Sequence, residues 1–208
     1  MKFSKILPVC LVSLGIMCSC GETKSENEES TKSCTAGEAV IENIMTRTSI
    51  RQFTDQSVSK DTLDLIVKAG MAAPSAMNKQ PWAFVVVTEK NVLDSLNAKH
   101  PYANLKTATA AIIVCGIMDK TIEGAGREYW VQDCSAATEN ILLAAHGLGL
   151  GAVWCGVYPV EERIKDVSGV LELPETIIPL NIVTMGYPAE NPEPKDKFNA
   201  DNIHYQKW

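Results

Sequence analysis

The sequence predicts one domain in which a β-sheet is covered on both faces by helices. Three observations predict it: the 208-residue length suits a single core, the composition is that of a globular protein, and apolar runs alternate with helical segments. Hydrophobic residues at 46% and charged residues at 21% disfavour disorder, collagen, coiled coil and a polytopic membrane protein. The net charge of −6 argues against nucleic acid, whose phosphates need clustered Lys and Arg.

The N-terminal segment 1–19 is predicted to be a signal peptide outside the fold. Two lysines precede an apolar run from residue 6 to residue 17, which is too short to span a bilayer as a helix. The residues around Cys20 resemble a bacterial lipoprotein signal, so Cys20 is the expected lipidation site, with Cys18 as a competitor. A cleaved signal without lipid is the alternative. The resemblance implies an exported, periplasmic or cell-surface lipoprotein whose only contact with a membrane is its lipid anchor.

Residues 20–37 are predicted to form a disordered acidic tether. The segment is dominated by Glu, Ser, Thr and Lys and has no apolar periodicity, so it cannot bury enough surface to offset chain entropy. It is either a solvated spacer or a tether of the kind that directs some lipoproteins to the cell surface. The folded domain is therefore expected at 38–208.

The first half of the domain is predicted to contain two helices, a loop and a strand. Apolar residues from Val40 to Met45 share one helical face, and a stronger helix is expected over 60–72 with Ser59 as its N-cap. Two prolines then enclose a loop over 73–81. The β-branched run at 83–88 is predicted to be a strand.

The second half continues the alternation. Helices are expected at 92–98, at 127–148, where glycines end the helix, and from residue 159 to residue 167. Strands are expected at 110–117, 152–157 and 177–186. Three prolines after residue 187 predict an extended arm. No G-x-G-x-x-G or P-loop motif is present in the sequence.

The four cysteines beyond the signal do not indicate a metal site. Cys34, Cys115, Cys134 and Cys155 form no C-x-x-C pair and have no zinc-type spacing with histidines, so no metal is expected. Cys115 and Cys155 lie in apolar strand-like runs, where a free cysteine is usually a small core residue. The sequence does not decide whether any of the four form disulfides.

Two polar groups could carry chemistry. Arg47, Ser49 and Arg51 alternate, so an extended backbone would turn two guanidinium groups and a hydroxyl to one side as a phosphate clamp. A solvated strand edge would show the same alternation. The second group lies on the loop between prolines and suits the edge of a heteroaromatic ring, although a polar turn has similar composition. Its members are Pro74, Ser75, Asn78 and Gln80.

These pieces together resemble the nitroreductase family of FMN-dependent enzymes. The resemblance is carried, in order along the chain, by RTSIRQF at 47–53, AAPSAMNKQPWAFVVV at 72–87, DCSAATENILLAAHGLGLGAVWCG at 133–156, MGYPAENPEPK at 185–195 and HYQKW at 204–208. It implies an α+β fold, a three-layer sandwich with a central mixed β-sheet flanked by helices. It also implies an intertwined homodimer with FMN bound at the subunit interface.

The resemblance also implies roles for individual residues. Arg47 and Ser49 would hold the FMN phosphate, and Arg51 would lie toward the N1 and O2 edge of the flavin. The remaining implied contacts to FMN come from three places. The loop between the prolines lines the ring, partly from the partner chain, and Trp154, Cys155 and Gly156 lie beside the ring. Lys195 and Lys197 lie at the phosphate. Tyr129 and Trp130 either line the open flavin face or are ordinary packing residues.

The implied activity is two-electron transfer from NAD(P)H, or another donor, to nitroaromatic, quinone or similar flat acceptors by a ping-pong mechanism. Because the redox chemistry belongs to the flavin, no catalytic side chain is expected. The alternatives are a specialised flavin reductase or dehalogenase, and a non-catalytic flavin-binding surface lipoprotein. Export makes the donor uncertain, because little NAD(P)H is found outside the cytoplasm.

Overall fold

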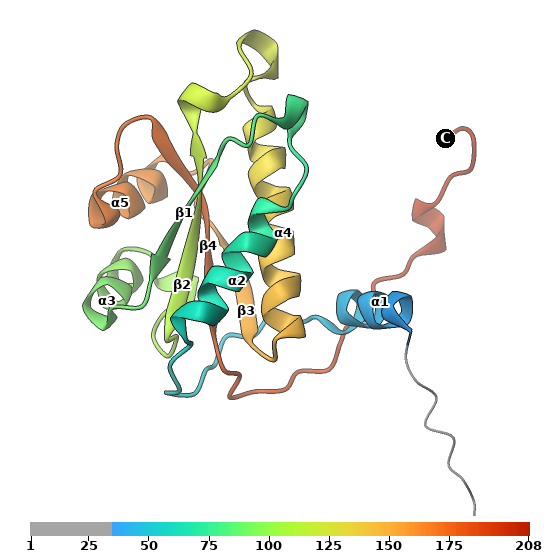
Figure 1. Cartoon of the computed structure of the whole chain (residues 1–208), viewed down its shortest axis with the longest axis horizontal. Helices are drawn as coiled ribbons and strands as arrows, with labels where there is room; N and C mark the ends of the chain where they lie inside the picture. The colour runs from blue at the N-terminus through green and yellow to red at the C-terminus, as the bar shows by residue number, and fades with distance from the viewer. Residues whose placement is uncertain (1–34) are drawn as a thin grey trace, which may run out of the picture. The chain divides into compact units, whose positions relative to one another are not determined.

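A computed structural model describes residues 35–208 (Figure 1). The predicted signal peptide, the Cys20 lipidation site, Cys34 and the tether up to residue 34 lie outside the described residues. Within residues 35–208, no helix is both long enough and apolar enough to cross a membrane.

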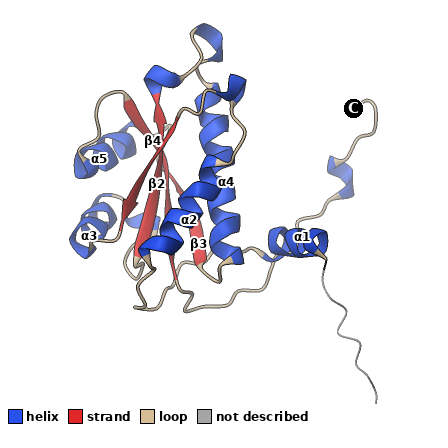
Figure 2. Cartoon of the chain, in the orientation of Figure 1, coloured by secondary structure: helices blue, strands red, loops and turns tan. Residues whose placement is uncertain are grey.

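The centre of the domain is a four-stranded sheet in the order β1-β2-β4-β3 (Figure 2). Its strands are β1 (Trp82–Val87), β2 (Ala110–Ile117), β3 (Gly151–Gly156) and β4 (Ile177–Gly186). All three strand pairs are antiparallel, with Val87 opposite Ala111 and Ala110 opposite Met185. The expected mixed sheet is therefore wrong for the described chain, whose parallel pairing is limited to an isolated bridge between Ser49 and Ala152.

The connections between strands explain this correction. Helix α3 (Lys90–Lys99) joins β1 to its neighbour β2, and α5 (Glu161–Leu171) joins β3 to its neighbour β4. In both cases one strand ends and the next begins at the same end of the sheet, so the paired strands run antiparallel. Helix α4 (Tyr129–Gly147) instead crosses from β2 to β3 with β4 between them. Alternation of helices and strands in a sequence does not distinguish these two kinds of connection.

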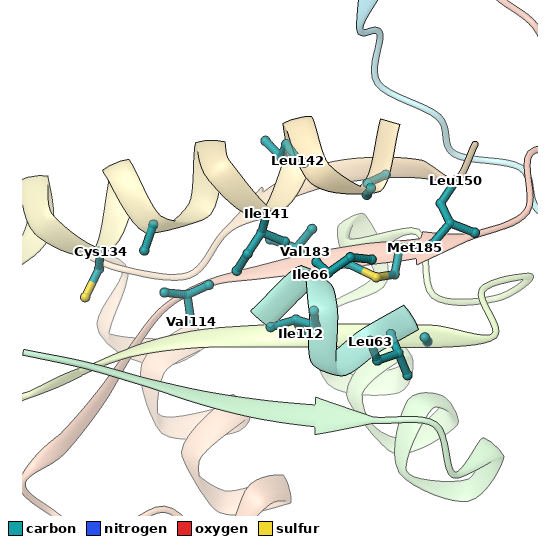
Figure 3. Packing of buried hydrophobic residues seen from close by; sticks show 14 of the residues in the cluster. Leu63, Ile66, Ile112, Val114, Cys134, Ile141, Leu142, Leu150, Val183 and Met185 are labelled. Atoms are coloured by element: carbon teal, nitrogen blue, oxygen red, sulfur yellow. The ribbon is translucent and has the colours of Figure 1, made fainter. Parts of the chain in front are cut away.

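One face of the sheet is covered by α2 (Lys60–Met71) and α4 (Figures 1 and 3). Ile66 of α2 and Ile141 of α4 are fully buried against β2 residues Ile112 and Val114. Each such apolar side chain contributes about 1.5–3 kcal/mol when it is fully removed from water. This layer is the larger of the two hydrophobic clusters.

The opposite face of the sheet is covered by α3 and α5. Leu93 and Leu96 of α3 pack with Ile113 of β2 and Ile182 of β4, all at 0–1% exposure. Successive residues of β2 therefore point to different apolar layers, which is why this strand reads as an unbroken apolar run.

The start of α2 and both ends of α4 lie within two residues of the prediction, whereas the helix expected over 159–167 spans Glu161–Leu171 and leaves Pro159 outside it. Ser59 caps α2 by accepting a hydrogen bond from the Thr62 N–H at 3.1 Å. Helix α4 ends at Gly147, two residues before Gly149, which adopts a positive φ of 77° that glycine tolerates without strain. Cys115, Cys134 and Cys155 are buried free thiols, and burial raises the pKa of Cys115 and of Cys134 to about 12.

Helix α1 (Ala36–Thr46) and the arm after β4 lie outside these layers (Figure 1). Helix α1 begins with a capping box between Thr35 and Glu38, so it starts inside the last residues of the predicted tether. It has no buried residue, although its apolar face includes Ile41 at 61% exposure. Residues 191–208 of this arm are exposed throughout.

Candidate functional site

A cationic cavity of about 240 Å³ lies between the segment after α1 and the C-terminal arm. The structure brings five of the sequence-predicted site residues to its wall: Arg47, Ser49, Arg51, Lys195 and Lys197. Thr48, Pro192 and Glu193 complete the lining. Four cationic side chains thus face one carboxylate, which makes the cavity suited to an anion that carries more than one negative charge.

The sequence of the first wall explains its geometry. After α1 the chain becomes extended, and the Ile50 N–H donates to the Ala152 carbonyl at 3.1 Å beside edge strand β3. Ile50 is buried, at 8% exposure, so its neighbours Ser49 and Arg51 turn the other way toward the cavity. The alternation R-x-S-x-R therefore lines one side of the cavity, as predicted from the spacing.

The C-terminal arm forms the second wall of the cavity, and a short run of backbone hydrogen bonds holds it beside the first wall. The Thr54 N–H donates to Tyr187 O and the Ala189 N–H donates to Gln52 O, both at 2.9 Å. One further contact comes from the Glu190 carboxylate, which accepts from the backbone N–H of Arg51. Because this ladder fixes where the arm begins, Lys195 and Lys197 come to the same cavity as Arg47.

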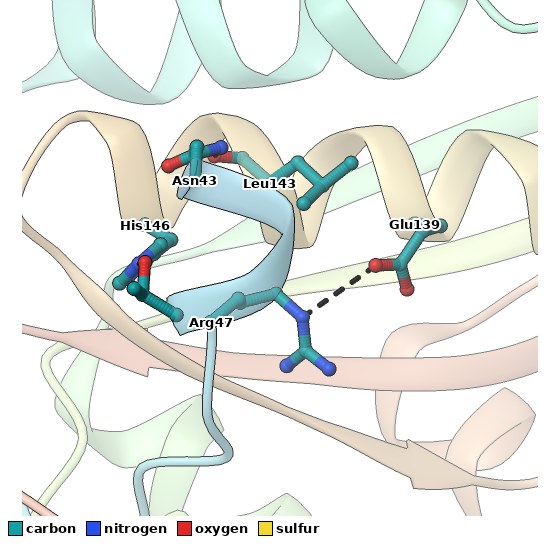
Figure 4. A network of polar contacts seen from close by, with 6 residues as sticks. Asn43, Arg47, Glu139, Leu143 and His146 are labelled. Carbon is teal, nitrogen blue, oxygen red and sulfur yellow. Dashed lines mark hydrogen bonds and ion pairs between the residues drawn. The ribbon is translucent and has the colours of Figure 1, made fainter. Parts of the chain in front are cut away.

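Arg47 is held at the surface of α4. Its Nε lies 3.5 Å from Glu139 Oε1, and the arginine side chain is only 18% exposed (Figure 4). Thr46 Oγ1 lies 2.9 Å from His146 Nε2, which ties the end of α1 to the last turns of α4. Desolvation, with a smaller effect of the Arg47 cation, lowers the pKa of His146. This shift favours the neutral imidazole in the contact with Thr46, while the Arg47 cation pairs with Glu139.

The carboxamide loop forms a structured turn. Its Ser75 Oγ accepts from the Gln80 N–H at 2.9 Å, and Asn78 Oδ1 accepts from Gln80 Nε2 at 3.1 Å. Met77, Asn78 and Gln80 have positive φ values of 51°, 54° and 50°. Three left-handed residues without glycine are costly, and such strain is concentrated at functional sites. Pro74 begins this loop and is exposed.

Asp133 is a residue of this region that the sequence reasoning missed. It is 7% exposed in the first half of α4, and its Oδ1 accepts from the Ala76 N–H at 2.8 Å. The signal available in the sequence is a carboxylate among the apolar and small residues in the first half of a long helix. The loop therefore packs on α4 at Asp133, whereas Arg47 of the cavity wall contacts α4 further along, at Glu139.

The β3 residues lie on the edge of the sheet. Trp154 is 38% exposed, and Gly156 O accepts from His100 Nε2 at 3.1 Å and from Arg163 Nη1 at 3.2 Å. Burial raises the pKa of the Cys155 thiol, an effect opposed by hydrogen bonds with Asn104 and Thr184 and, more weakly, by the Arg51 cation. Arg51 itself lines the cavity, two positions after Ser49, which forms a bridge to Ala152 of β3.

The aromatic pair ahead of α4 divides between two environments. Trp130 is 2% exposed and packs edge-on against Tyr158, with ring centroids 4.9 Å apart. It is an ordinary core residue, whereas Tyr129 is 48% exposed.

The pattern of the nitroreductase family matches residues 44–100 and 95–187 of the chain. This chain belongs to the nitroreductase family. It is therefore an oxidoreductase with an α+β fold of that family. The matched residues include the first wall of the cavity, the carboxamide loop, α4 and β3.

Individual relatives agree with this assignment. A protein of Methanothermobacter thermautotrophicus, provisionally named NADH dehydrogenase/NAD(P)H nitroreductase, is 48% identical over 81% of this chain and 87% of its own. A solved structure with the same provisional name, from Bacteroides thetaiotaomicron, is 45% identical over 82% of this chain and 98% of its own, with a TM-score of 0.77. A provisionally named nitroreductase of Desulfovibrio desulfuricans, solved in complex with FMN, is 31% identical over 81% of this chain and 97% of its own, with a TM-score of 0.69.

Proposed function

We propose that this chain is an FMN-dependent oxidoreductase that transfers two electrons from NAD(P)H, or another donor, to nitroaromatic compounds, quinones or similar flat acceptors. The proposed order of events is ping-pong: the donor reacts first and leaves before the acceptor binds. The observation that carries the proposal is the cationic cavity, where two arginines, two lysines and the Ser49 hydroxyl meet.

The residues present fit the phosphate end of FMN. A phosphate monoester carries a charge of about −1.5 to −2 near neutral pH and offers three strong acceptor oxygens. Arg47 and Arg51 can donate in forked pairs, Ser49 adds a hydroxyl donor, and the lysines add point charges. The cations outnumber the Glu193 carboxylate by four to one in the lining. A neutral ligand would not need this excess.

The remaining residues have positioning roles in this proposal. When bound, FMN supplies the two-electron redox chemistry. Arg51 would place a cation toward the ring, since it lines the cavity on the segment that bridges to β3 through Ser49. The carboxamides of Asn78 and Gln80 would donate to and accept from the ring edge, on a loop that Asp133 holds in place. No side chain of the site needs to act as an acid or base.

The proposal includes a homodimer with FMN at the subunit interface. Within one chain the carboxamide loop contacts the first half of α4, and Arg47 of the cavity wall contacts α4 further along, at Glu139. A second copy could bring its own loop to the cavity. The apolar face of α1 and the arm residues Phe198 and Tyr205, at 74% and 79% exposure, supply the surface for that copy.

The proposed location is outside the cytoplasm, either periplasmic or at the cell surface, with the chain anchored to a bacterial membrane through a lipid on Cys20. This part of the proposal is supported by the sequence resemblance alone, because residues 1–34 lie outside the described structure. Incorporation of labelled fatty acid into the whole chain, and its loss in Cys20→Ser, is the direct measurement.

The test of the function is flavin binding by the apo-protein, followed by turnover. Wild type is expected to bind FMN, to oxidise NAD(P)H with a quinone or nitroaromatic acceptor, and to show the parallel reciprocal plots of a ping-pong mechanism. Arg47→Ala should raise the Kd for FMN by about 10- to 100-fold, the loss expected for a charge-assisted hydrogen bond. Quenching of flavin fluorescence measures the Kd for FMN of wild type and of the variant.

The matched control is Lys60→Ala, which removes an exposed cation at the start of α2 that pairs with Asp64 on the same helix. Its Kd for FMN should stay within about twofold of wild type, because a distant exposed charge is screened by salt. Wild-type protein that binds no FMN, or Arg47→Ala with wild-type affinity, would contradict the proposed phosphate site.

A further inference from the structure

Glu190 makes an unusual pair of contacts at the start of the arm. A single carboxylate oxygen, Oε1, accepts from two consecutive backbone N–H groups, those of Arg51 and Gln52, the second at 3.0 Å. Glu190 is half-buried and does not line the cationic cavity. Its charge is satisfied by backbone donors of the segment that carries Ser49 and Arg51.

We propose that Glu190 is a positioning residue for the phosphate end of the FMN site, an inference that rests on the proposed function. Its two hydrogen bonds join the wall that contributes Arg47, Ser49 and Arg51 to the arm that contributes Lys195 and Lys197. One side chain thereby sets the spacing of cations that come from opposite ends of the domain.

The place of Glu190 in the arm supports this role. In the described chain it is the last residue of the arm that is hydrogen-bonded to the segment from Arg51 to Thr54. Beyond it, the hydrogen bonds recorded for 191–208 join arm residues to one another. Lys195 follows five positions later, so Glu190 is the point from which the lysines reach the cavity.

The charge of Glu190 argues against a direct role in binding. A carboxylate near an anion site repels the anion, so its presence beside a phosphate cavity requires another reason. Because both bonds fall on one oxygen, the amide oxygen of a glutamine at this position could accept both without the charge. Acceptor geometry and charge can therefore be separated by substitution.

The experiment titrates the full-length apo-protein with FMN and, separately, with riboflavin, which lacks the phosphate. The variants are Glu190→Ala, Glu190→Gln and, as the matched control, Glu175→Ala, an exposed carboxylate ahead of β4 that does not line the cavity. Flavin fluorescence gives the Kd, and circular dichroism confirms that each variant is folded.

Glu190→Ala is expected to raise the Kd for FMN roughly 10-fold, as the loss of two hydrogen bonds predicts, and to leave the Kd for riboflavin within about twofold. Glu190→Gln should bind FMN as tightly as wild type or more tightly, because it keeps the acceptor and removes a negative charge. Glu175→Ala should leave the Kd for FMN within about twofold of wild type, because a distant exposed charge is screened by salt.

Three results would overturn the inference. The first is Glu190→Ala with wild-type affinity for FMN, and the second is an equal loss of FMN and riboflavin, which indicates general disruption. The third is Glu190→Gln binding FMN more weakly than wild type, a comparison that stands even where the alanine variant does not fold. Wild type that binds riboflavin and FMN equally would overturn the proposed phosphate site itself, and this inference with it.

Discussion

Ile66 of α2 and Ile41 of α1 are both isoleucines on amphipathic helices, yet Ile66 is 0% exposed and Ile41 is 61% exposed. The sheet and its two helical layers bury their apolar faces within one chain. Helix α1 and the C-terminal arm do not, although they carry the same kind of apolar residue. The comparison teaches that the layered region is complete in a single chain, whereas the outer region presents a surface suited to a partner.

The largest expected effect comes from shortening one isoleucine in each region. Ile66→Ala should lower the free energy of unfolding by about 2–5 kcal/mol at every protein concentration, because it leaves a cavity in a packed layer. Ile41→Ala should change it by less than about 0.5 kcal/mol where the chain is monomeric, and should lower stability only at concentrations that favour a dimer.

Urea unfolding followed by circular dichroism at two protein concentrations makes this measurement, with the oligomeric state determined by light scattering. Equal losses for the two variants in dilute solution would remove the distinction between the regions. A concentration-independent result for both variants would count against the proposed dimer.

The second prediction concerns the point where the two regions meet. A Cβ at Gly151 of β3 would lie 2.6 Å from Ile50 Cγ2, so Gly151→Ala should displace the segment that leads from α1 to the cavity. We expect a loss of about 1–3 kcal/mol in unfolding free energy and weaker FMN binding. The matched control is Gly169→Ala in α5, where a Cβ meets nothing within 4 Å.

Gly169→Ala should stabilise the protein by about 0.5–1 kcal/mol, because alanine is the better helix former and space is available. Thermal unfolding and FMN titration of both variants provide the comparison. Gly151→Ala with unchanged stability and FMN affinity would show that the close approach of Ile50 is not required.

The smallest expected effect is on pH dependence and compares one histidine from each region. Desolvation lowers the pKa of His100, which is 3% exposed, and also that of His146 at the α1–α4 contact. A lowered folded pKa means that the unfolded chain binds more protons below about pH 6.5, so stability is full above that pH and is lost as the pH falls toward the folded value.

The free energy of unfolding of wild type should fall between pH 7 and pH 5. His100→Gln should reduce this fall more than His146→Gln does. Urea unfolding across that pH range provides the measurement. A larger change in His146→Gln would mean that the outer contact is the more strongly desolvated of the two.

Much of the layered region could be predicted from local pattern. The bounds of β2 and β4 match the predicted 110–117 and 177–186, because β2 is an unbroken apolar run and β4 is a mostly apolar one. The direction of the strands could not be predicted, since it depends on whether a helix returns to the end of the sheet that the chain has left.

The candidate site shows the same division. The alternation of Arg47, Ser49 and Arg51 predicted one side of a clamp, because alternate residues of an extended chain share a face. Glu190 and Asp133 were missed, because each acts through a backbone N–H more than fifty positions away in the chain. No local pattern reports such a contact.

The sequence by itself determined the helices, the strands and the residue types available to hold an anion, since these depend on periodicity and on short-range chemistry. Only the tertiary structure decided that the strands are antiparallel, that lysines near the C-terminus meet arginines near residue 50, and that α1 keeps its apolar face exposed. These outcomes depend on contacts between segments far apart in the chain, whose free energy no single segment contains.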